Sequence, residues 1–377
     1  MTANEAQQTM TPGELAEARE YGRLELACDL ADKALDLTYL AAFTFLWAIA
    51  ADAWLAGWID RDWLRWAAMF LVVTLGHLLV SFPLSFYASH RLEHRFGMSK
   101  LTFAGWLWRY VKRNTLAIVF GLLLMVALFA VIRWTGPWWW LAAAAGSFLV
   151  SIVFAQLAPV LIMPLFYKIE KVDQPELAGR IERLAMGTGL AIEGVYRMDM
   201  SRETVKANAM LAGLGRTRRV ILGDTLLDGF TPDEIEVIFA HEIGHHVHRH
   251  IPKLIAAGMV FMVAGFWACD FVLRAWMQHT SGVVDYAALP VSSLPLLMFS
   301  LTAFSLLLEP VQNVLSRRYE RQCDRYALKR TGLQEAYLSA FRKLAVLNKD
   351  DPCPNPVAVF LFHSHPPIAE RLAIADD

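Results

Sequence analysis

A short run of residues in the second half of the chain has the composition of a metal-dependent hydrolase site. His241 and His245 are four positions apart, and Glu242 directly follows the first of them. On an α-helix, residues four apart lie on one face, so both imidazoles can reach one metal ion while Glu242 stays free as a general base. Residues 231–234 (TPDE) have the capping pattern of a helix start just upstream. The segment therefore predicts an HExxH zinc site on a helix.

A catalytic zinc ion also needs a third protein ligand and one position left open for water. Glu320 and Asp324 are again four apart, which suits one metal ligand and one carboxylate that holds a ligating histidine. From spacing alone, both carboxylates could equally face solvent and pair with neighbouring arginines. His246, His248 and His250 are rival ligands, but on an uninterrupted helix the last two point away from the metal. We interpret these three histidines as solvated or interfacial.

The elements that carry these residues alternate with membrane segments. Hydrophobic residues make up 56% of the 377 residues and charged residues only 19%, unlike a typical soluble domain. Six apolar runs are long enough to cross about 30 Å of hydrocarbon: 37–58, 63–88, 115–132, 138–163, 254–277 and 291–312. Asp52, His77, Asp270 and Glu309 lie within them and are candidates to line water-filled space between helices. For Asp52, Asp270 and Glu309, which lie near span ends, access to interfacial water is an equal alternative.

The distribution of positive charge predicts the orientation of the chain. All but four of the 35 Lys and Arg residues lie in residues 1–36, 89–114, 164–253 and 313–377. By the positive-inside rule, these segments and both termini are cytoplasmic, and the short connections face outward. The net charge of −1 offers no basic surface for nucleic acid. The four cysteines have no CxxC spacing, so no disulfide framework is predicted.

We expect two polar segments to assemble into one domain on the cytoplasmic face. The predicted layout is a cytoplasmic amphipathic N-terminal arm (1–36), four transmembrane helices with a cytoplasmic loop at 89–114 (37–163), the first part of a zinc-peptidase domain (164–252), two further transmembrane helices (253–312) and its second part (313–377). Helical periodicity covers 175–190, and extended stretches are predicted at 194–198, 206–211 and 218–222.

Further segments accompany the HExxH motif in a definite order. They are EHRFG at 93–97, PLFYK at 164–168, NA at 208–209, VILGDTLL at 220–227, SRRYE at 316–320 leading to Asp324, and HSHPP at 363–367 followed by ERL at 370–372. With these segments in this order, the chain resembles the integral-membrane zinc metalloproteases of the CAAX prenyl protease type. That group includes the proteases that process the a-factor and their bacterial relatives. The ordered set covers most of the chain after the second span.

The resemblance implies a ligand set and a reaction. His241, His245 and Glu320 hold one Zn²⁺ per chain, and Glu242 is the general base. Glu242 takes a proton from the water that attacks the scissile carbonyl and passes it to the leaving amine. The resemblance moves Glu320 from an open alternative to the expected third ligand.

The resemblance also implies roles for residues around the metal. His365 and Arg371 are expected to line the active site and to help stabilise the oxyanion. Asp324 is expected behind the zinc ligands. Asn208 and Ala209 are expected on a substrate-binding edge strand, where an extended peptide would pair with the main chain of 206–211.

The implied fold class is mainly α: a polytopic α-helical membrane protein whose cytoplasmic, gluzincin-like HExxH zinc-peptidase domain contains a small β-sheet. Eukaryotic members have seven spans around a water-filled chamber in the membrane, whereas six spans are predicted here. We expect the bacterial inner membrane as the location, with the active site in the cytoplasm. The expected partners are the lipid bilayer and a peptide or protein substrate that can carry a lipid, and the sequence indicates no oligomeric state.

The predicted function is a membrane-embedded zinc metalloendopeptidase that hydrolyses membrane-associated or lipidated polypeptides. One alternative is a protease of the HtpX type, which degrades misfolded membrane proteins but has fewer spans before the zinc helix. A non-enzyme alternative is a six-span transporter with a structural metal. Because a structural zinc normally has four protein ligands and no free general base, the residues favour an enzyme.

Overall fold

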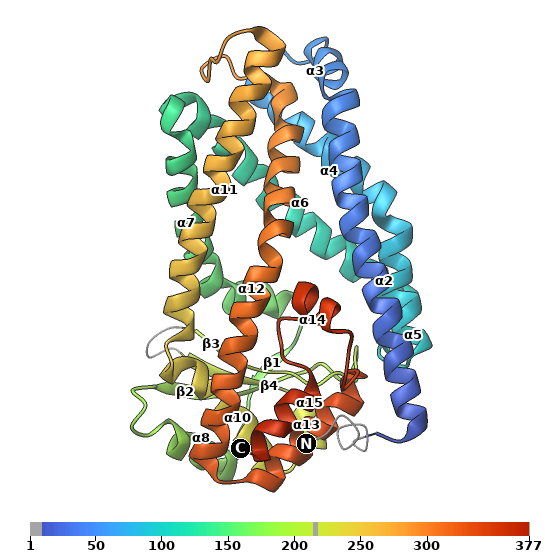
Figure 1. The fold of residues 1–377 in the computed structure, drawn as a ribbon, viewed down its shortest axis with the longest axis vertical. Helices are drawn as coiled ribbons and strands as arrows, with labels where there is room; N and C mark the ends of the chain where they lie inside the picture. Colours follow the sequence, from blue (N-terminus) through green and yellow to red (C-terminus); the bar gives the residue numbers. More distant parts are fainter. Residues whose placement is uncertain (1–9, 214–217, 377) are drawn as a thin grey trace.

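Long helices run together along most of the molecule, and a smaller part with helices and strands lies at one end (Figure 1). This structure, a computed structural model, describes residues 10–213 and 218–376, so the first nine residues of the predicted arm lie outside it. Its long helices are α2 (Pro12–Ala42), α4 (Asp62–Phe86), α6 (Phe103–Thr135), α7 (Trp139–Leu157), α11 (His250–Ser281) and α12 (Leu294–Thr331). Large apolar side chains such as Leu79 and Leu307 are more than 75% exposed on them, as lipid-facing positions require.

Five helical stretches among the described residues are long and apolar enough to cross a membrane, whereas the sequence predicts six spans. The difference lies in the stretch Phe103–Leu165, which contains both α6 and α7. A short 3₁₀ turn, Gly136–Trp138, joins these helices, and they pack against each other. Gly136 has φ 55° and ψ −128°, a conformation that residues with a side chain avoid. The predicted spans 115–132 and 138–163 are therefore two helices of one stretch.

The N-terminal arm and the first span form one continuous helical stretch. After α2, a π-helical turn (Phe43–Trp47) leads directly into α3 (Ala48–Ala56). Thr11 caps the beginning of α2 in a capping box with Glu14. The polar half of α2 packs on the part of the molecule that contains the strands, where Ala18 is fully buried.

Tyr21 fixes this polar half to the segment after the second span. Its hydroxyl lies 2.6 Å from Glu93 Oε1, on the short helix α5 (Glu93–Arg95), and Lys206 Nζ donates to the same hydroxyl at 3.1 Å. The EHRFG segment therefore serves as a docking point for the arm.

The polar part contains a four-stranded sheet of order β1-β2-β4-β3. The strands are β1 (Ile169–Lys171), β2 (Ile192–Met198), β3 (Ala209–Ala212) and β4 (Arg218–Gly223). β2 and β4 are parallel, whereas the β1–β2 and β3–β4 pairs are antiparallel. The three predicted extended stretches correspond to β2, β3 and β4. β3 lies at one edge of the sheet, where a further strand can add.

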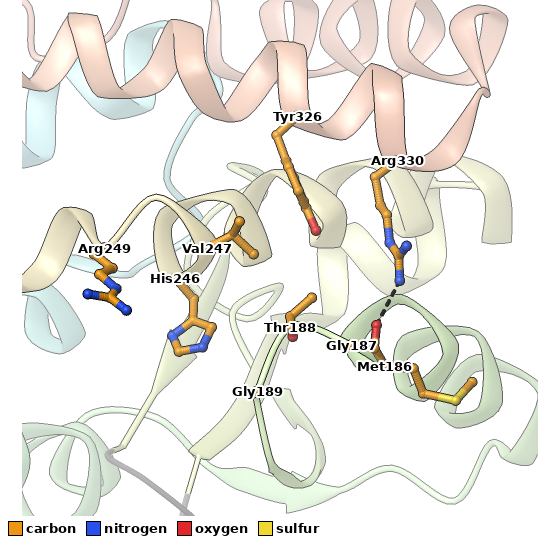
Figure 2. A pocket seen from close by; sticks show the side chains of 9 residues that line it. All are labelled: Met186, Gly187, Thr188, Gly189, His246, Val247, Arg249, Tyr326 and Arg330. Carbon is orange, nitrogen blue, oxygen red and sulfur yellow. Dashed lines mark hydrogen bonds between the residues drawn. The ribbon is translucent and has the colours of Figure 1, made fainter.

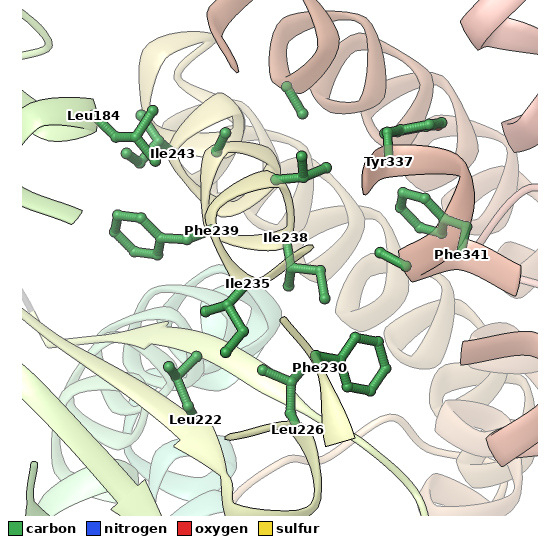
Figure 3. Close-up of a cluster of buried hydrophobic side chains, with 14 of the residues drawn as sticks. Leu184, Leu222, Leu226, Phe230, Ile235, Ile238, Phe239, Ile243, Tyr337 and Phe341 are labelled. Atoms are coloured by element: carbon green, nitrogen blue, oxygen red, sulfur yellow. The ribbon is translucent and has the colours of Figure 1, made fainter. Parts of the chain in front are cut away.

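Helix α10 (Pro232–Val247) forms the centre of the polar part. The surrounding helices are α8 (Pro175–Ala185), α9 (Asp224–Gly229), α13 (Gln334–Asn348), α14 (Pro356–Phe362) and α15 (Ile368–Ala373). Figure 3 shows Ile235 and Phe239 of α10 in a buried cluster with Leu222 of β4 and with Tyr337 and Phe341 of α13. Burying each such side chain contributes roughly 1.5–3 kcal/mol, so the helix with the HExxH residues is firmly held on both sides.

Two of the ionisable residues predicted within spans join helix α2 to its neighbours. Glu309 Oε2 of α12 accepts a hydrogen bond from Lys33 Nζ at 2.6 Å. His77 Nε2 of α4 lies 2.7 Å from Asp36 Oδ1. Both pairs are partly exposed and connect different helices.

The other two ionisable residues, Asp270 and Asp52, form hydrogen bonds with the segment that connects α11 and α12. Asp270 is buried and accepts hydrogen bonds from Trp139 Nε1 at 2.6 Å and Tyr286 Oη at 2.7 Å. Asp52 Oδ2 accepts from the backbone N–H of Ser292 at 3.0 Å. These carboxylates therefore have structural partners near the ends of the spans.

Candidate metal centre

Helix α10 positions the HExxH residues, and the predicted capping box holds its first turn. Glu234 N donates to Thr231 Oγ1 at 3.3 Å, and Thr231 N donates to Glu234 Oε2 at 2.7 Å. The buried Glu234 carboxylate also accepts from Ser339 at 2.6 Å and from Lys343 at 2.7 Å, both on α13. Burial alone would raise the pKa of Glu234, but these hydrogen bonds lower it. The start of α10 is thus tied to α13.

The imidazoles of His241 and His245 converge on the carboxylate of Glu320, which comes from α12. His241 Nε2 lies 3.2 Å from Glu320 Oε2, and His245 Nε2 lies 3.3 Å from Glu320 Oε1. Gly244 allows the two helices this close approach, because a Cβ added there would lie only 3.0 Å from the Cα of Cys323. The structure therefore brings together the two histidines and the carboxylate that the sequence predicts as ligands.

Asp324 holds His241 from the side away from Glu320. Its Oδ1 lies 2.8 Å from His241 Nδ1, which leaves Nε2 directed toward Glu320. The carboxylate is fully buried and accepts two hydrogen bonds from Arg371 of α15, at 2.9 Å from Nε and 2.7 Å from Nη2. This bidentate pairing occupies the Arg371 guanidinium, whose Nη2 is 3.8 Å from Glu320 Oε2.

The surroundings of Glu320 fit a bound cation. Its Oε2 is buried, and although His241 Nε2 lies 3.2 Å away, no described residue makes a well-aligned hydrogen bond to this oxygen, which is uncommon for a buried polar atom. Burial alone would lower the pKa of His241, but Asp324 and Glu320 raise it to about 9, so the site favours positive charge. Two imidazole nitrogens and one carboxylate are the ligand types of a catalytic zinc ion.

Cys323 offers a different third ligand. One ligand atom from each of His241, His245 and Cys323 lies within 4.8 Å of the others. The Cys323 thiol is buried between α10 and α12, facing Gly244, and its Sγ lies 3.5 Å from His250 Nδ1.

A cavity of about 860 Å³ adjoins the ligand cluster and lies between the sheet edge, α10, α14 and the polar half of α2. All predicted site residues except His245 and Asp324 line it. Glu242 is partly buried there. Burial raises the pKa of Glu242, and His241 and His245 oppose the shift.

The remaining predicted residues lie around the same cavity. The exposed side chain of His365 reaches the ligand cluster, with Nε2 3.7 Å from Glu320 Oε2. Ala209 begins the edge strand β3, and the carbonyl of Asn208 accepts from Gly223 N at 2.8 Å. The cavity therefore has a metal-ligand cluster, an acid and a strand edge side by side.

Helix α2 is the part of this cavity that sequence reasoning missed. Arg19, Arg23 and Glu25 of α2 line it together with Asp350 and Asp351, which follow α13. The sequence predicted an amphipathic N-terminal arm, but not the surface on which it packs.

The interpretation of His250 as solvated or interfacial is wrong. α10 ends at Val247, and Arg249 adopts the left-handed conformation (φ 53°, ψ 42°) before α11 begins at His250. This break turns His250 back toward α12, where its side chain is fully buried. His246 and His248 are half-buried.

Figure 2 shows the residues that line a second cavity, whose volume is about 480 Å³. His246, Arg249 and Arg330 border it, and Arg330 Nη2 donates to the carbonyl of Met186 at 2.9 Å. None of the predicted site residues lines this cavity. His246 therefore faces a surface separate from the candidate metal centre.

Family models match nearly the whole chain. Residues 2–168 match the CAAX prenyl protease N-terminal model, described as five membrane helices, and residues 171–377 match peptidase family M48. The "Uncharacterized metalloprotease YhfN" of Bacillus subtilis is 30% identical, over 97% of this chain and 86% of its own length. "CAAX prenyl protease 1" of Saccharomyces cerevisiae is 29% identical, over 79% of this chain and 69% of its own.

A solved structure has the same fold. The crystal structure of Ste24p from S. mikatae matches with a TM-score of 0.86 at 25% identity, over 98% of this chain and 90% of the other. These findings confirm the predicted family and the predicted fold of a polytopic α-helical membrane protein with a zinc-peptidase domain that contains a small β-sheet. They favour neither the HtpX-type protease nor the transporter. The chain belongs to peptidase family M48 and is a multi-pass membrane zinc metalloprotease of the CAAX prenyl protease type.

Proposed function

We propose that His241, His245 and Glu320 bind one zinc ion per chain and that Glu242 is the general base for peptide hydrolysis. The observation that carries this proposal is the convergence of two Nε2 atoms on one buried carboxylate. Glu320 is a better third ligand than Cys323, because its oxygens approach both imidazoles while the thiol packs between the helices.

The residues of this chain have separate tasks in the proposed reaction. Zinc, when bound, supplies Lewis acidity toward a carbonyl oxygen and a water molecule. Glu242 takes a proton from the attacking water and gives it to the leaving amine nitrogen as the C–N bond breaks. His365 is better placed than Arg371 to donate a hydrogen bond to the oxyanion, because Asp324 already holds the guanidinium.

The substrate backbone is proposed to add as an extended strand beside β3. This strand lies at the sheet edge, and Asn208 and Ala209 at its beginning line the cavity together with Glu242. Main-chain pairing at a strand edge provides affinity with little dependence on sequence. Asn208 would keep one peptide group of the substrate in register.

We further propose that the substrates are membrane-associated or lipidated polypeptides, as the names of the CAAX prenyl protease relatives suggest. The cavity supports this proposal, because part of its wall is α2, which continues into a membrane span. Mass spectrometry of products tests it with three substrates: a farnesylated peptide ending in a CAAX-type sequence, its unprenylated form and an unfolded membrane protein. The purified zinc-loaded protein is expected to remove the last three residues of the farnesylated peptide.

Two results would contradict this substrate class. Scattered cuts in the unfolded membrane protein, with the farnesylated peptide intact, would indicate quality control of the HtpX type. Equal cleavage of the farnesylated and unprenylated peptides would show that the enzyme does not require the lipid. The Glu242→Gln protein is the matched control for contaminating peptidases in each reaction.

We also propose that both termini and the active site are cytoplasmic, in a bacterial inner membrane. The concentration of Lys and Arg in the polar segments supports this orientation. Reporter fusions within residues 164–252 are expected to report a cytoplasmic location, and fusions within 282–290 an external one. The reverse pattern would overturn the assignment of sides.

A further inference from the structure

We propose that His250 is a positioning residue for the metal ligand His245, holding its imidazole through an Nδ1–Nδ1 hydrogen bond. This inference rests on the proposed function, in which His245 binds zinc through Nε2. It gives a role to a buried histidine that the proposed reaction does not otherwise use.

The contacts of His250 define its orientation. Its Nδ1 lies 3.2 Å from His245 Nδ1, and its Nε2 lies 3.0 Å from Gln322 Oε1. The ring stacks on Tyr319, with centroids 4.1 Å apart and planes within 10°. Both Tyr319 and Gln322 belong to α12, the helix that also carries Glu320. The ring is fully buried, so the protein holds it in one orientation.

These contacts assign the protons along a chain of three side chains. An amide oxygen only accepts hydrogen bonds, so the Nε2 of His250 that faces Gln322 Oε1 carries the proton. The Nδ1 of a neutral His250 is then an acceptor, and His245 Nδ1–H donates to it. His245 therefore keeps a free lone pair on Nε2, the nitrogen that faces Glu320. The Cys323 thiol, 3.5 Å away, is a longer second neighbour of the same Nδ1.

The two proposed histidine ligands are thus supported differently. Asp324 supports His241 with a carboxylate at 2.8 Å, whereas His250 supports His245 with a neutral imidazole. The neutral partner adds no negative charge to a site that already contains three carboxylates, those of Glu242, Glu320 and Asp324. Partners of this kind orient a ligating imidazole, and their loss typically weakens metal binding about 10–100-fold.

Two substitutions separate the hydrogen bond from the packing. His250→Phe keeps an aromatic ring on Tyr319 but removes the acceptor. His250→Asn removes the ring but keeps an acceptor oxygen near the position of Nδ1. The measurements are the zinc dissociation constant, by competition with a chelator, and thermal unfolding of the zinc-stripped full-length protein. The phenylalanine variant is expected to bind zinc about 10–100-fold more weakly than the wild type, with an unchanged unfolding temperature. The asparagine variant is expected to bind zinc more tightly than the phenylalanine variant.

The matched control is His248→Gln. This histidine is in the same turn and stacks on His250, but it makes no hydrogen bond to His245 among the described residues. The control is expected to bind zinc as the wild type does. Zinc affinity at the wild-type level in His250→Phe would overturn the inference, and so would an asparagine variant that binds as weakly as the phenylalanine variant.

A His245→Ala variant distinguishes this inference from the proposed ligand set. Loss of zinc in His245→Ala, with full affinity in His250→Phe, would remove only the positioning role. Full zinc affinity in His245→Ala would overturn the ligand assignment and, with it, the inference. Both results come from direct zinc binding, so neither depends on a substrate.

Discussion

Replacing Glu242 with Gln is expected to remove nearly all peptidase activity while leaving zinc binding intact. The amide has the shape of the carboxylate but cannot accept a proton from water, and general base catalysis typically contributes about 10²–10⁴ in rate. Glu242 lines the cavity beside the ligand cluster, and its carboxylate is not among the three proposed ligands. The measurement is the rate of peptide cleavage together with zinc content per chain.

A glutamate on the same helix provides the control. Glu236 is partly buried and pairs with Arg180 at 3.0 Å, so Glu236→Gln changes an identical group away from the cavity. The activity of Glu236→Gln should stay near that of the wild type, because Glu236 does not line the cavity that holds Glu242. Substantial turnover by a clean Glu242→Gln preparation would remove Glu242 from the role of base. Loss of zinc from that variant would instead point to a direct or structural part in metal binding.

Replacing Glu320 with Ala is expected to lower zinc content sharply. Its carboxylate lies within 3.3 Å of both Nε2 atoms, and His241 and His245 alone leave the metal with two protein ligands. The loss of affinity should exceed the roughly 10–100-fold that follows removal of an outer partner. Metal analysis of the purified variant, with thermal unfolding of the zinc-stripped protein as a measure of folding, tests this expectation.

Cys323→Ala is the matched comparison, because the thiol is the other candidate for the third ligand. Under the proposed ligand set, this variant keeps its zinc. If Cys323→Ala lost the metal and Glu320→Ala retained it, the ligand set would be His241, His245 and Cys323. Unchanged zinc stoichiometry in Glu320→Ala would by itself rule out Glu320 as a required ligand.

Local patterns predicted the elements of the fold well. The capping pattern at 231–234 begins a helix at Pro232, and the extended stretches lie in β2, β3 and β4. Apolar runs located the membrane helices because crossing hydrocarbon demands length and composition, both of which are local properties. The structure has five separate apolar stretches among the described residues, whereas the sequence predicts six spans. The tight turn at Gly136 joins α6 and α7 with almost no interruption, so two predicted spans fall in one stretch.

From spacing alone, the candidate site was predictable only where its residues are local, and the distant residues such as Glu320 and Asp324 were expected from the family resemblance. His241 and His245 lie on one helical face because they are four residues apart. The burial of His250 was not predictable, because it depends on one left-handed residue, Arg249, at which the helix turns. Arginine has no preference for that conformation, so no sequence signal marks the break.

The sequence by itself determined a pair of histidines on one helical face, an acid beside them and the membrane helices around them. The tertiary structure alone decided which distant groups meet that pair. Glu320 and Asp324 approach His241 because Gly244 lets α10 and α12 pack closely, and Arg371 is held by Asp324 rather than left free in the cavity. The polar half of α2 forms a wall of the same cavity. Such contacts depend on how side chains fill space between helices far apart in the chain, which periodicity does not encode.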